Sequence, residues 1–453
     1  MNPDVAAGQS PLRRGIARRS VLRGLGTGAL AAGAGGTLAA CTAGGKGAQA
    51  ASATGTITLG YISPFTGSLS GFASGDKFVI DTIRSTPAYQ NGFTVGGRKY
   101  RVDIVVTDSG SDPNRASQLA RQLILNSNVD LLLTSSTPET VNPVAVVAQT
   151  EGVPCLATND PWESWYGGLG GNSAKPTMTL QYCTLFFFGL KEFQGCFVPM
   201  WNAVPASSKN VACQYPNDAD GNAFRAVFEP LIKASGYKPV DGGAYTDGTT
   251  DYTTMISSFK AADAQYLSNC PLPPDFNVFW KQAHQQGWRP KLATVAKVLL
   301  FPADTVALGP LVNNVATDSW WGPYMPNRSS LDPQLTAAQL ASAFQAQTGQ
   351  QWVQSIGSSY SLFEVAHQAF TTGVSDPHNK QEVASALHKV NYSGMCGPLN
   401  FASGPAPGVA IIPPVGVQWK ASAGKYPFEM KVVDNSLNKA VKIGANLEPT
   451  NAG

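Results

Sequence analysis

The sequence contains few charged residues and none of the short motifs that mark common catalytic sites. Charged side chains make up 13% of its 453 residues, and four residues are histidines. No HExxH metal-binding helix, GxSxG nucleophile turn or phosphate-binding P-loop occurs. CxxC pairs are absent as well, which argues against a metal centre or a redox role for the cysteines. The sequence therefore predicts no metal, no cofactor and no catalytic residues.

An excess of positive charge is missing once the N-terminus is set aside. The formal net charge is +3, but residues 1–40 contribute five arginines and one aspartate. The rest of the chain has 27 basic and 28 acidic residues, a net charge of −1. Nucleic-acid-binding surfaces are rich in lysine and arginine, so this balance argues against nucleic acid as a partner.

The N-terminus has the features of an export signal. Residues 18–23 (RRSVLR) form a twin-arginine pattern, followed by a glycine- and alanine-rich segment that is less apolar than a membrane-spanning helix. Residues 38–41 (LAAC) resemble the box at which bacterial lipoproteins are cleaved and lipidated. We therefore predict a signal peptide over 1–40, a lipidated Cys41 that holds the protein on the outer side of the bacterial cell membrane, and a flexible tether over 41–55. The alternative is a leader that is cleaved without lipidation.

Six cysteines remain after Cys41. An even number of cysteines outside the cytoplasm permits up to three disulfides, and six cysteines allow fifteen pairings. The sequence does not choose among these pairings. The six are Cys155, Cys183, Cys196, Cys213, Cys270 and Cys396.

A strand, a polar turn and a helix follow one another near residue 130. Residues 129–133 (VDLLL) form a short apolar run, typical of a strand buried on both faces of a parallel sheet. Four hydroxyl residues follow at 134–137, and then apolar residues recur at helical spacing. Asn142 and Pro143 mark either the start of this helix or an early kink.

A second strand and polar turn complete this unit. Residues 155–157 (CLA) are expected to form a buried strand, and residues 158–160 (TND) a polar turn after it. Both polar clusters then fall at the carboxyl ends of neighbouring parallel strands, where open α/β sheets bind their ligands. The alternative is that these residues only cap turns and helices.

The residues before this unit show the same alternation. Strands are expected over 56–62 and 100–107, a helix over 71–83, and another helix that begins at Asp112 and Pro113. Alternating strands and helices predict an α/β fold with a doubly wound parallel sheet. About 400 residues after the leader exceed one compact core and indicate two domains.

Several blocks resemble a known family. GYISPFTGSLSGF, VVTDSGSDPNRASQLARQLI, VDLLLTSSTPET and VPCLATND are similar to the first lobe of bacterial ABC-transporter solute-binding proteins of the branched-chain amino acid (Leu/Ile/Val-binding) type. Segments between residues 210 and 286 resemble the second lobe, and the resemblance spans roughly 56–430. It implies the type I periplasmic-binding-protein fold, with two lobes, a hinge crossed several times and a ligand trapped by lobe closure. It also implies a monomer with ABC permease subunits as partners and no enzymatic activity.

The resemblance implies a discontinuous division into lobes. The first lobe would contain residues 56–182 and 320–402. The second lobe would contain residues 183–318 and 409–450.

The resemblance also implies a set of ligand-binding residues at strand ends. In this family, hydroxyl and main-chain groups after the third and fourth strands usually hold the carboxylate and ammonium of the ligand. Neutral O–H and N–H donors near a helix N-terminus suit a small anion. The matching positions are Ser135, Ser136, Thr137, Ala157 and Thr158, with Ser63 and Phe65 in the first loop as weaker candidates.

Two positions depart from the family pattern. Asp220 stands where the family often has a tyrosine, which suggests a ligand with a cation or additional hydrogen-bond donors; otherwise Asp220 is a solvated turn residue. A calcium loop here is excluded, because Pro216 and Val227 would occupy required ligand positions. Lys297 falls near an expected acidic residue and would suit an acidic group on the ligand; otherwise it is a surface lysine.

Two aromatic clusters are unusual for the family. The first follows the polar turn at Asp160 and consists of Trp162, Trp165 and Tyr166, and the second consists of Trp320, Trp321 and Tyr324. Aromatic faces at the mouth of a cleft can stack on a ring-shaped ligand. The alternative is that they pack the hinge and the lobes.

The sequence thus favours an extracytoplasmic lipoprotein that captures a small polar organic ligand, an amino acid or a related compound, for an ABC importer. Two alternatives remain open. The same fold can present its liganded state to a receptor as a sensor, and a dispersed Ser/His/Asp site would make the protein a secreted hydrolase. The sequence does not identify the ligand.

Overall fold

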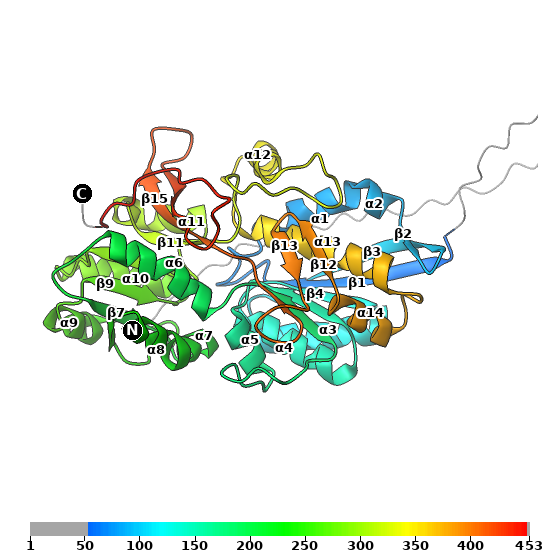
Figure 1. Cartoon of the computed structure of the whole chain (residues 1–453), viewed down its shortest axis with the longest axis horizontal. Helices are drawn as coiled ribbons and strands as arrows, with labels where there is room; N and C mark the ends of the chain where they lie inside the picture. Colours follow the sequence, from blue (N-terminus) through cyan, green and yellow to red (C-terminus); the bar gives the residue numbers. More distant parts are fainter. Residues whose placement is uncertain (1–52, 451–453) are drawn as a thin grey trace, which may run out of the picture. The chain divides into compact units, whose positions relative to one another are not determined.

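The structure is a computed structural model that describes residues 53–450. The predicted signal peptide, Cys41 and most of the predicted tether lie outside the described residues. Two seven-stranded sheets flanked by helices form two lobes, and a separate two-stranded sheet accompanies them (Figure 1). This is the α/β architecture that the alternation of strands and helices predicts.

The first lobe is built on a sheet in the order β14-β6-β5-β4-β1-β3-β2, in which all neighbours are parallel except β2 and β3. Helices cover both faces: α1 packs on α13, and α3 packs on α4 (Figure 1). The strands are β1 (Gly55–Ser63), β2 (Phe93–Val95), β3 (Arg98–Asp108), β4 (Leu131–Thr134), β5 (Cys155–Thr158), β6 (Cys183–Phe186) and β14 (Val409–Ala410). The helices are α1 (Asp76–Ser85), α2 (Pro87–Gln90), α3 (Pro113–Ser127), α4 (Pro138–Glu151), α5 (Trp162–Gly168), α12 (Ala337–Thr348), α13 (Ser355–Gly373) and α14 (Lys380–Leu387). The hairpin β12 (Asn391–Gly394) and β13 (Gly397–Asn400) forms the small sheet.

The second lobe is built on a sheet in the order β16-β15-β11-β10-β9-β7-β8. Strand β15 runs antiparallel to both of its neighbours, β11 and β16. The strands are β7 (Asn210–Gln214), β8 (Lys238–Asp241), β9 (Tyr266–Asn269), β10 (Leu292–Val295), β11 (Ala316–Ser319), β15 (Val415–Ala421) and β16 (Phe428–Asp434). The helices are α6 (Leu190–Ala203), α7 (Ala219–Ala223), the π-helix η1 (Phe224–Phe228), α8 (Glu229–Ala234), α9 (Thr253–Ala261), α10 (Pro273–Gln285), α11 (Pro302–Leu308) and the 3-10 helix η2 (Gly309–Val312).

Local sequence explains where two helices of the first lobe begin. The Asp112 side chain accepts a hydrogen bond from the backbone N–H of Arg115 at 2.7 Å, and Pro113 opens α3, as the sequence predicts. Helix α4 begins earlier than expected, at Pro138, because a proline at the first position lacks only an N–H that would have no helical partner. Pro143 lies inside α4, so the Asn142-Pro143 pair is not the start of the helix.

The chain crosses between the two sheets three times. The crossings follow β6, β11 and β14, where successive strands belong to different sheets. Strand β6 pairs with β5, Cys183 lying opposite Cys155, and β14 pairs with β6. Two strands that the expected ranges placed in the second lobe therefore lie in the first sheet. The apolar run at β6 extends that sheet by one buried strand before the chain leaves it.

None of the helices in the range 53–450 is both long and apolar enough to cross a membrane. The six cysteines after Cys41 are all buried and are not joined in disulfides in this part of the chain.

Candidate functional site

The carboxyl ends of the two parallel sheets face each other across a cavity, which we call the interlobe cavity. The centre of a water-sized sphere can reach about 30 Å³ of it, enough for about two water molecules. Its polar lining consists of Thr137, Asn159, Asp220, Lys297 and Asp318. Its aromatic lining consists of Phe72, Phe187, Phe188, Phe193, Phe224 and Trp320. Both lobes contribute to each group.

An ion-pair cluster centred on Lys297 links the lobes beside the cavity. Lys297 lies in the loop after β10, in the second lobe. Its ammonium is 2.7 Å from the carboxylate of Glu139, which is in the first turn of α4 in the first lobe. It also lies 2.8 Å from Asp220 and 3.5 Å from Asp218. Lys297 has a φ of 67°, a left-handed conformation that is uncommon for a residue other than glycine. The backbone at Lys297 is therefore strained.

Two further contacts join the lobes. The Ser164 hydroxyl of α5 donates a hydrogen bond of 2.9 Å to Asp220. The rings of Phe72 and Phe301 meet edge to face, with centroids 4.7 Å apart. The lobes are therefore in direct contact around the cavity.

Burial and neighbouring charges shift the ionisation of this cluster. Burial works against the ammonium of Lys297, but the carboxylates of Asp220, Glu139 and Asp218 raise its pKa well above the usual value. Burial likewise opposes ionisation of Glu139, yet Lys297 holds its pKa below the usual value. Burial outweighs Lys297 at Asp220 and raises its pKa to about 6. The Lys297–Glu139 pair is therefore fully charged near neutral pH.

Two buried aspartates near the cavity are not engaged by the cluster. Asp160 and Asp318 are 0% and 1% exposed, and neither has a hydrogen-bond partner for its carboxyl oxygens within residues 53–450. Burial, followed by the charges of Asp220 and Glu139, raises the pKa of Asp160 well above its usual value. Burial raises the pKa of Asp318 to about 7. A buried polar group without a partner costs roughly 1–3 kcal/mol, and more when charged, so these groups favour a bound partner.

Three of the predicted ligand-binding residues line the interlobe cavity: Thr137, Asp220 and Lys297. Ser136 is next to them with its backbone at a φ of 112°, and its hydroxyl has no hydrogen-bond partner in the described part of the chain. Lys297 is 8% exposed and Asp220 is 3% exposed, so neither is the surface lysine or the solvated turn residue that the sequence left open.

Other predicted residues at the strand ends make contacts within the protein. The Thr158 hydroxyl donates a hydrogen bond of 2.9 Å to the carbonyl of Phe186. The hydroxyl of Ser135 accepts one of 3.0 Å from Asn159. Ala157 is fully buried in β5. These three residues position the strand ends and are not among the residues that line the cavity.

The candidates in the first loop and at the first aromatic cluster lie outside the cavity lining. Ser63 donates a hydrogen bond of 2.6 Å to Asp76, and the half-buried Phe65 packs on the core of the first lobe. The Trp162 ring contacts Gly189, at the first crossing between the lobes. Trp320 lines the cavity, and its ring meets that of Phe187 edge to face at 5.0 Å.

Several residues of the site are not among the predicted ones. Glu139, Asp218 and Asp318 are acidic residues close to strand ends, so the rule that located the hydroxyl clusters could have found them. The aromatic lining gave no such signal, because Phe187 and Phe188 continue the apolar run of β6 and are indistinguishable from core residues in the sequence.

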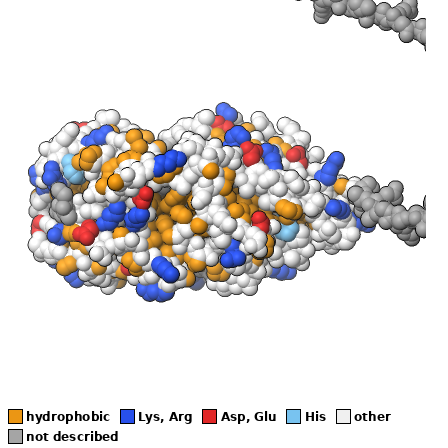
Figure 2. All heavy atoms as spheres, turned by 90° about the horizontal axis from the view of Figure 1, so that it is seen from above, with side chains coloured by type: hydrophobic (Ala, Val, Ile, Leu, Met, Phe, Trp, Pro, Cys, Tyr) orange, Lys and Arg blue, Asp and Glu red, His pale blue; other side chains and the backbone are white. Residues whose placement is uncertain are grey.

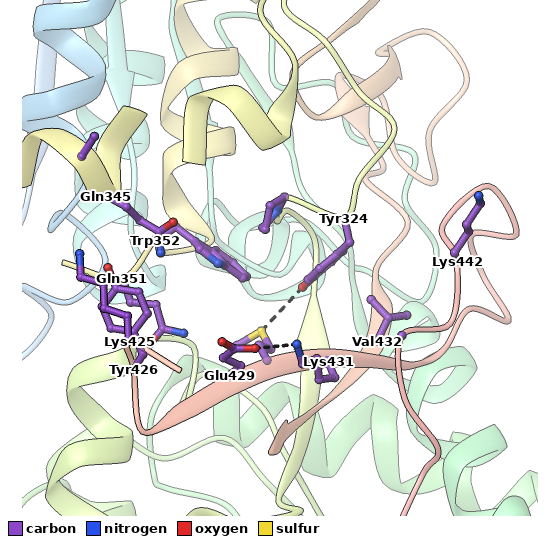
Figure 3. Close-up of a pocket in the computed structure, with 14 residues that line it drawn as sticks. Tyr324, Gln345, Gln351, Trp352, Lys425, Tyr426, Glu429, Lys431, Val432 and Lys442 are labelled. Carbon is purple, nitrogen blue, oxygen red and sulfur yellow. Dashed lines mark hydrogen bonds and ion pairs between the residues drawn. The ribbon is translucent and has the colours of Figure 1, made fainter. Parts of the chain in front are cut away.

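A second, wider hollow lies on the surface away from the strand ends. About 710 Å³ of it is open, between Tyr324 and Trp352 on one side and β16 on the other (Figure 3). Glu429 and Lys431 form an exposed ion pair of 2.6 Å within it. The face seen from above carries hydrophobic side chains along its middle, with lysine and acidic side chains beside them (Figure 2). Open α/β sheets bind ligands at the carboxyl ends of their strands, which favours the interlobe cavity over this hollow.

No group of three or more histidine, cysteine, aspartate or glutamate residues among residues 53–450 is arranged to hold a metal ion.

The sequence profile described as "periplasmic binding protein" matches residues 56–421. The chain belongs to the periplasmic binding protein family. The match spans both lobes and all three crossings, and it confirms the resemblance seen in the sequence. Periplasmic binding proteins act outside the cytoplasm as ligand-binding proteins, so the chain is a binding protein and not an enzyme.

Solved structures share the fold at low sequence identity. A leucine-binding protein, LivK, from Thermotoga maritima is 16% identical, with a TM-score of 0.65 over 82% of this chain and 97% of its own. A solute-binding protein of an ABC transporter from Rhodopseudomonas palustris, in complex with 3,4-dihydroxybenzoic acid, is 16% identical, with a TM-score of 0.64 over 85% and 98%. LivJ from Streptococcus pneumoniae, in complex with isoleucine, is 16% identical, with a TM-score of 0.62 over 84% and 99%. The likeness confirms the type I fold with its two α/β lobes.

Proposed function

We propose that this protein is the solute-binding lipoprotein of an ABC importer, which captures a small polar organic ligand between its lobes and delivers it to the permease subunits. The observation that carries the proposal is the interlobe cavity at the carboxyl ends of both sheets. It is lined by buried polar groups from both lobes, and Asp318 among them lacks a protein partner within the described residues.

Binding would work through the movement of the two lobes. The centre of a water-sized sphere reaches only about 30 Å³ of the cavity, which is too little for an amino acid or an aromatic acid, so entry would require the lobes to separate. A ligand that contacts both lobes then stabilises the arrangement in which they meet, in proportion to its preference for that arrangement. The predicted binding residues that supply polar groups at or beside the cavity are Ser136, Thr137, Asp220 and Lys297.

A ligand screen tests this function. The purified chain is heated with amino acids, amides, amines, aromatic acids and sugars, and its unfolding temperature is recorded. A ligand at a hundred times its dissociation constant adds about 2.7 kcal/mol to the stability of the folded state, which raises the unfolding temperature by several degrees. The test variant is Thr137→Val, at the cavity, and the matched control is Thr450→Val, far from the cavity. Only Thr137→Val should reduce the affinity for a ligand that binds in the cavity. A screen in which no class of solute shifts the unfolding temperature would contradict the proposal.

The proposed lipid anchor on Cys41 has a separate test. Cells that express the chain are fed a labelled fatty acid, and incorporation is compared with that of Cys41→Ala. Label in the unchanged chain but not in the variant supports the anchor, and label in neither leaves the cleaved leader as the explanation. A single acyl chain binds a membrane only weakly, so firm anchoring requires more than one.

A further inference from the structure

Several buried carboxyl and amide oxygens around the interlobe cavity lack a hydrogen-bond donor. Six oxygens of Glu139, Asn159, Asp160 and Asp318 have no donor within residues 53–450: one each on the first two residues and two each on the aspartates. The carboxyl oxygens accept hydrogen bonds when the carboxyl group is ionised, and the amide oxygen of Asn159 always accepts. A bound molecule that fits them must therefore bring N–H or O–H groups.

The charge of the cavity is also unbalanced. Lys297 is the cation in its lining, and its ammonium is already engaged by Glu139 at 2.7 Å and Asp220 at 2.8 Å. Asp160 and Asp318 then remain without a positive partner among the residues that the structure describes. Asp318 lines the cavity itself, and Asp160 follows the lining residue Asn159. A buried carboxylate is energetically costly unless it pairs with a cation or becomes protonated.

The cationic group that would receive an anion is already occupied. The Lys297 ammonium is saturated by carboxylates, and the Thr158 hydroxyl donates to a main-chain carbonyl. The N-terminus of α4, which would favour a negative group, has Glu139 in its own first turn. A ligand carboxylate would find the unpartnered hydroxyls of Ser136 and Thr137 as donors, but it would also meet the carboxylates of Asp220 and Asp318 in the cavity lining.

The remaining wall of the cavity is apolar and mainly aromatic. Phe72, Phe188, Phe224 and Trp320 are all at most 3% exposed, and they come from both lobes and from the crossings between them. Aromatic faces attract cations and also pack against apolar carbon. This combination suits a cationic group attached to an apolar body.

We propose that the ligand of this protein is an organic cation, an amine or guanidinium compound with an apolar body, whose N–H groups donate to Asp318 and Asp160 while its body packs between the phenylalanines and Trp320. The inference rests on the proposed solute-binding function and names the chemical class of the solute. A neutral zwitterion fits less well, because the Lys297 ammonium is already engaged by carboxylates of the protein and is not left to pair a ligand carboxylate.

The test compares three probes of one shape and different charge: 2-phenylethylamine, 2-phenylethanol and 3-phenylpropanoate, with agmatine as a guanidinium probe. Binding to the purified chain is measured by isothermal titration calorimetry at pH 8. The amine or agmatine should bind at least about tenfold more tightly than the alcohol and the acid, the smallest effect expected for a charge-assisted hydrogen bond. Equal or tighter binding of the acid or the alcohol would overturn the cationic class.

Asparagine variants locate the cation. Asp318→Asn keeps the size of the side chain. It should lower the affinity for the amine by about 10- to 100-fold and leave the affinity for the alcohol unchanged. Asp160→Asn is the second variant, which keeps the test decisive if the first does not fold. Glu429→Gln removes a carboxylate from the surface hollow and should leave the affinity unchanged. An amine affinity that both asparagine variants retain would overturn the assignment of these residues.

The screen of the previous section separates the two proposals. If an amino acid, an aromatic acid or a sugar binds and the cations do not, the solute-binding function stands and the cationic class is wrong. If no solute binds, both proposals fail together.

Discussion

Replacing Lys297 by methionine removes the cation that joins the two lobes at the interlobe cavity. Three carboxylates, those of Glu139, Asp218 and Asp220, would lose their positive partner, and the Lys297 side chain is only 6% exposed, so solvent screens it little. Removing one member of a buried ion pair costs roughly 3–5 kcal/mol, because the other member is left charged and out of water. This cost falls on the arrangement in which the lobes touch, since separated lobes allow the carboxylates to regain their hydration.

We therefore expect Lys297→Met to lose compactness before it loses its fold. Small-angle X-ray scattering should show a larger radius of gyration than for the unchanged chain, while circular dichroism retains the same helix and strand content. Glu139→Gln combined with Lys297→Met should recover part of the compact form, because one of the stranded charges is gone.

The matched control is Lys431→Met. Lys431 also pairs with a carboxylate, Glu429, at 2.6 Å, but it is 42% exposed, and exposed pairs contribute at most about 1 kcal/mol. If Lys297→Met were as compact and as stable as Lys431→Met, the role given to the cross-lobe pair would be refuted.

Three further changes test other parts of the structure. Raising the pH from 5 to 8 should lower the free energy of unfolding of the ligand-free protein. The pKa values of Asp220 and Asp318 are about 6 and 7 in the folded protein, against 3.8 for the free side chain. The stability that these two groups contribute below pH 3.8 is therefore lost as the pH rises through their folded pKa values. Urea denaturation at the two pH values measures this, and a rise in stability would contradict the assigned burial. Asp112→Ala removes the cap of α3 and should cost about 1 kcal/mol in the same assay; no loss would mean that the cap is dispensable. Gly189→Ala places a methyl group against the Trp162 ring at the first crossing and should cost about 1–3 kcal/mol through overpacking, whereas an unchanged denaturation midpoint would show that the ring moves freely.

Much of the first lobe could be predicted because its signals are local. The apolar run of β4 and the cap at Asp112 each lie within a few neighbouring residues, and strand ends in one sheet follow from the order of strands. The rule that places ligands at these ends led to Thr137, which lines the cavity.

The cross-lobe contacts could not be predicted in the same way. Lys297 and Glu139 are 158 residues apart, and only the three crossings bring them together. The position of Lys297 near an expected acidic residue suggests an acidic group on the ligand, but nothing in the sequence indicates that three carboxylates of the protein surround its ammonium. The observed boundary of the first lobe lies beyond the expected one at residue 182 for a related reason, since the short apolar run at Cys183 fits either sheet equally well.

The small volume of the interlobe cavity has a consequence for the speed of uptake. With space for about two water molecules, the cavity admits no solute until the lobes part, so each capture waits for an opening event. The observed rate of association should therefore rise with solute concentration only at first and then level off at the opening rate. Above that concentration the opening of the lobes, and not the supply of solute, would limit the rate of binding under the proposed function, and a stronger Lys297–Glu139 pair would slow it.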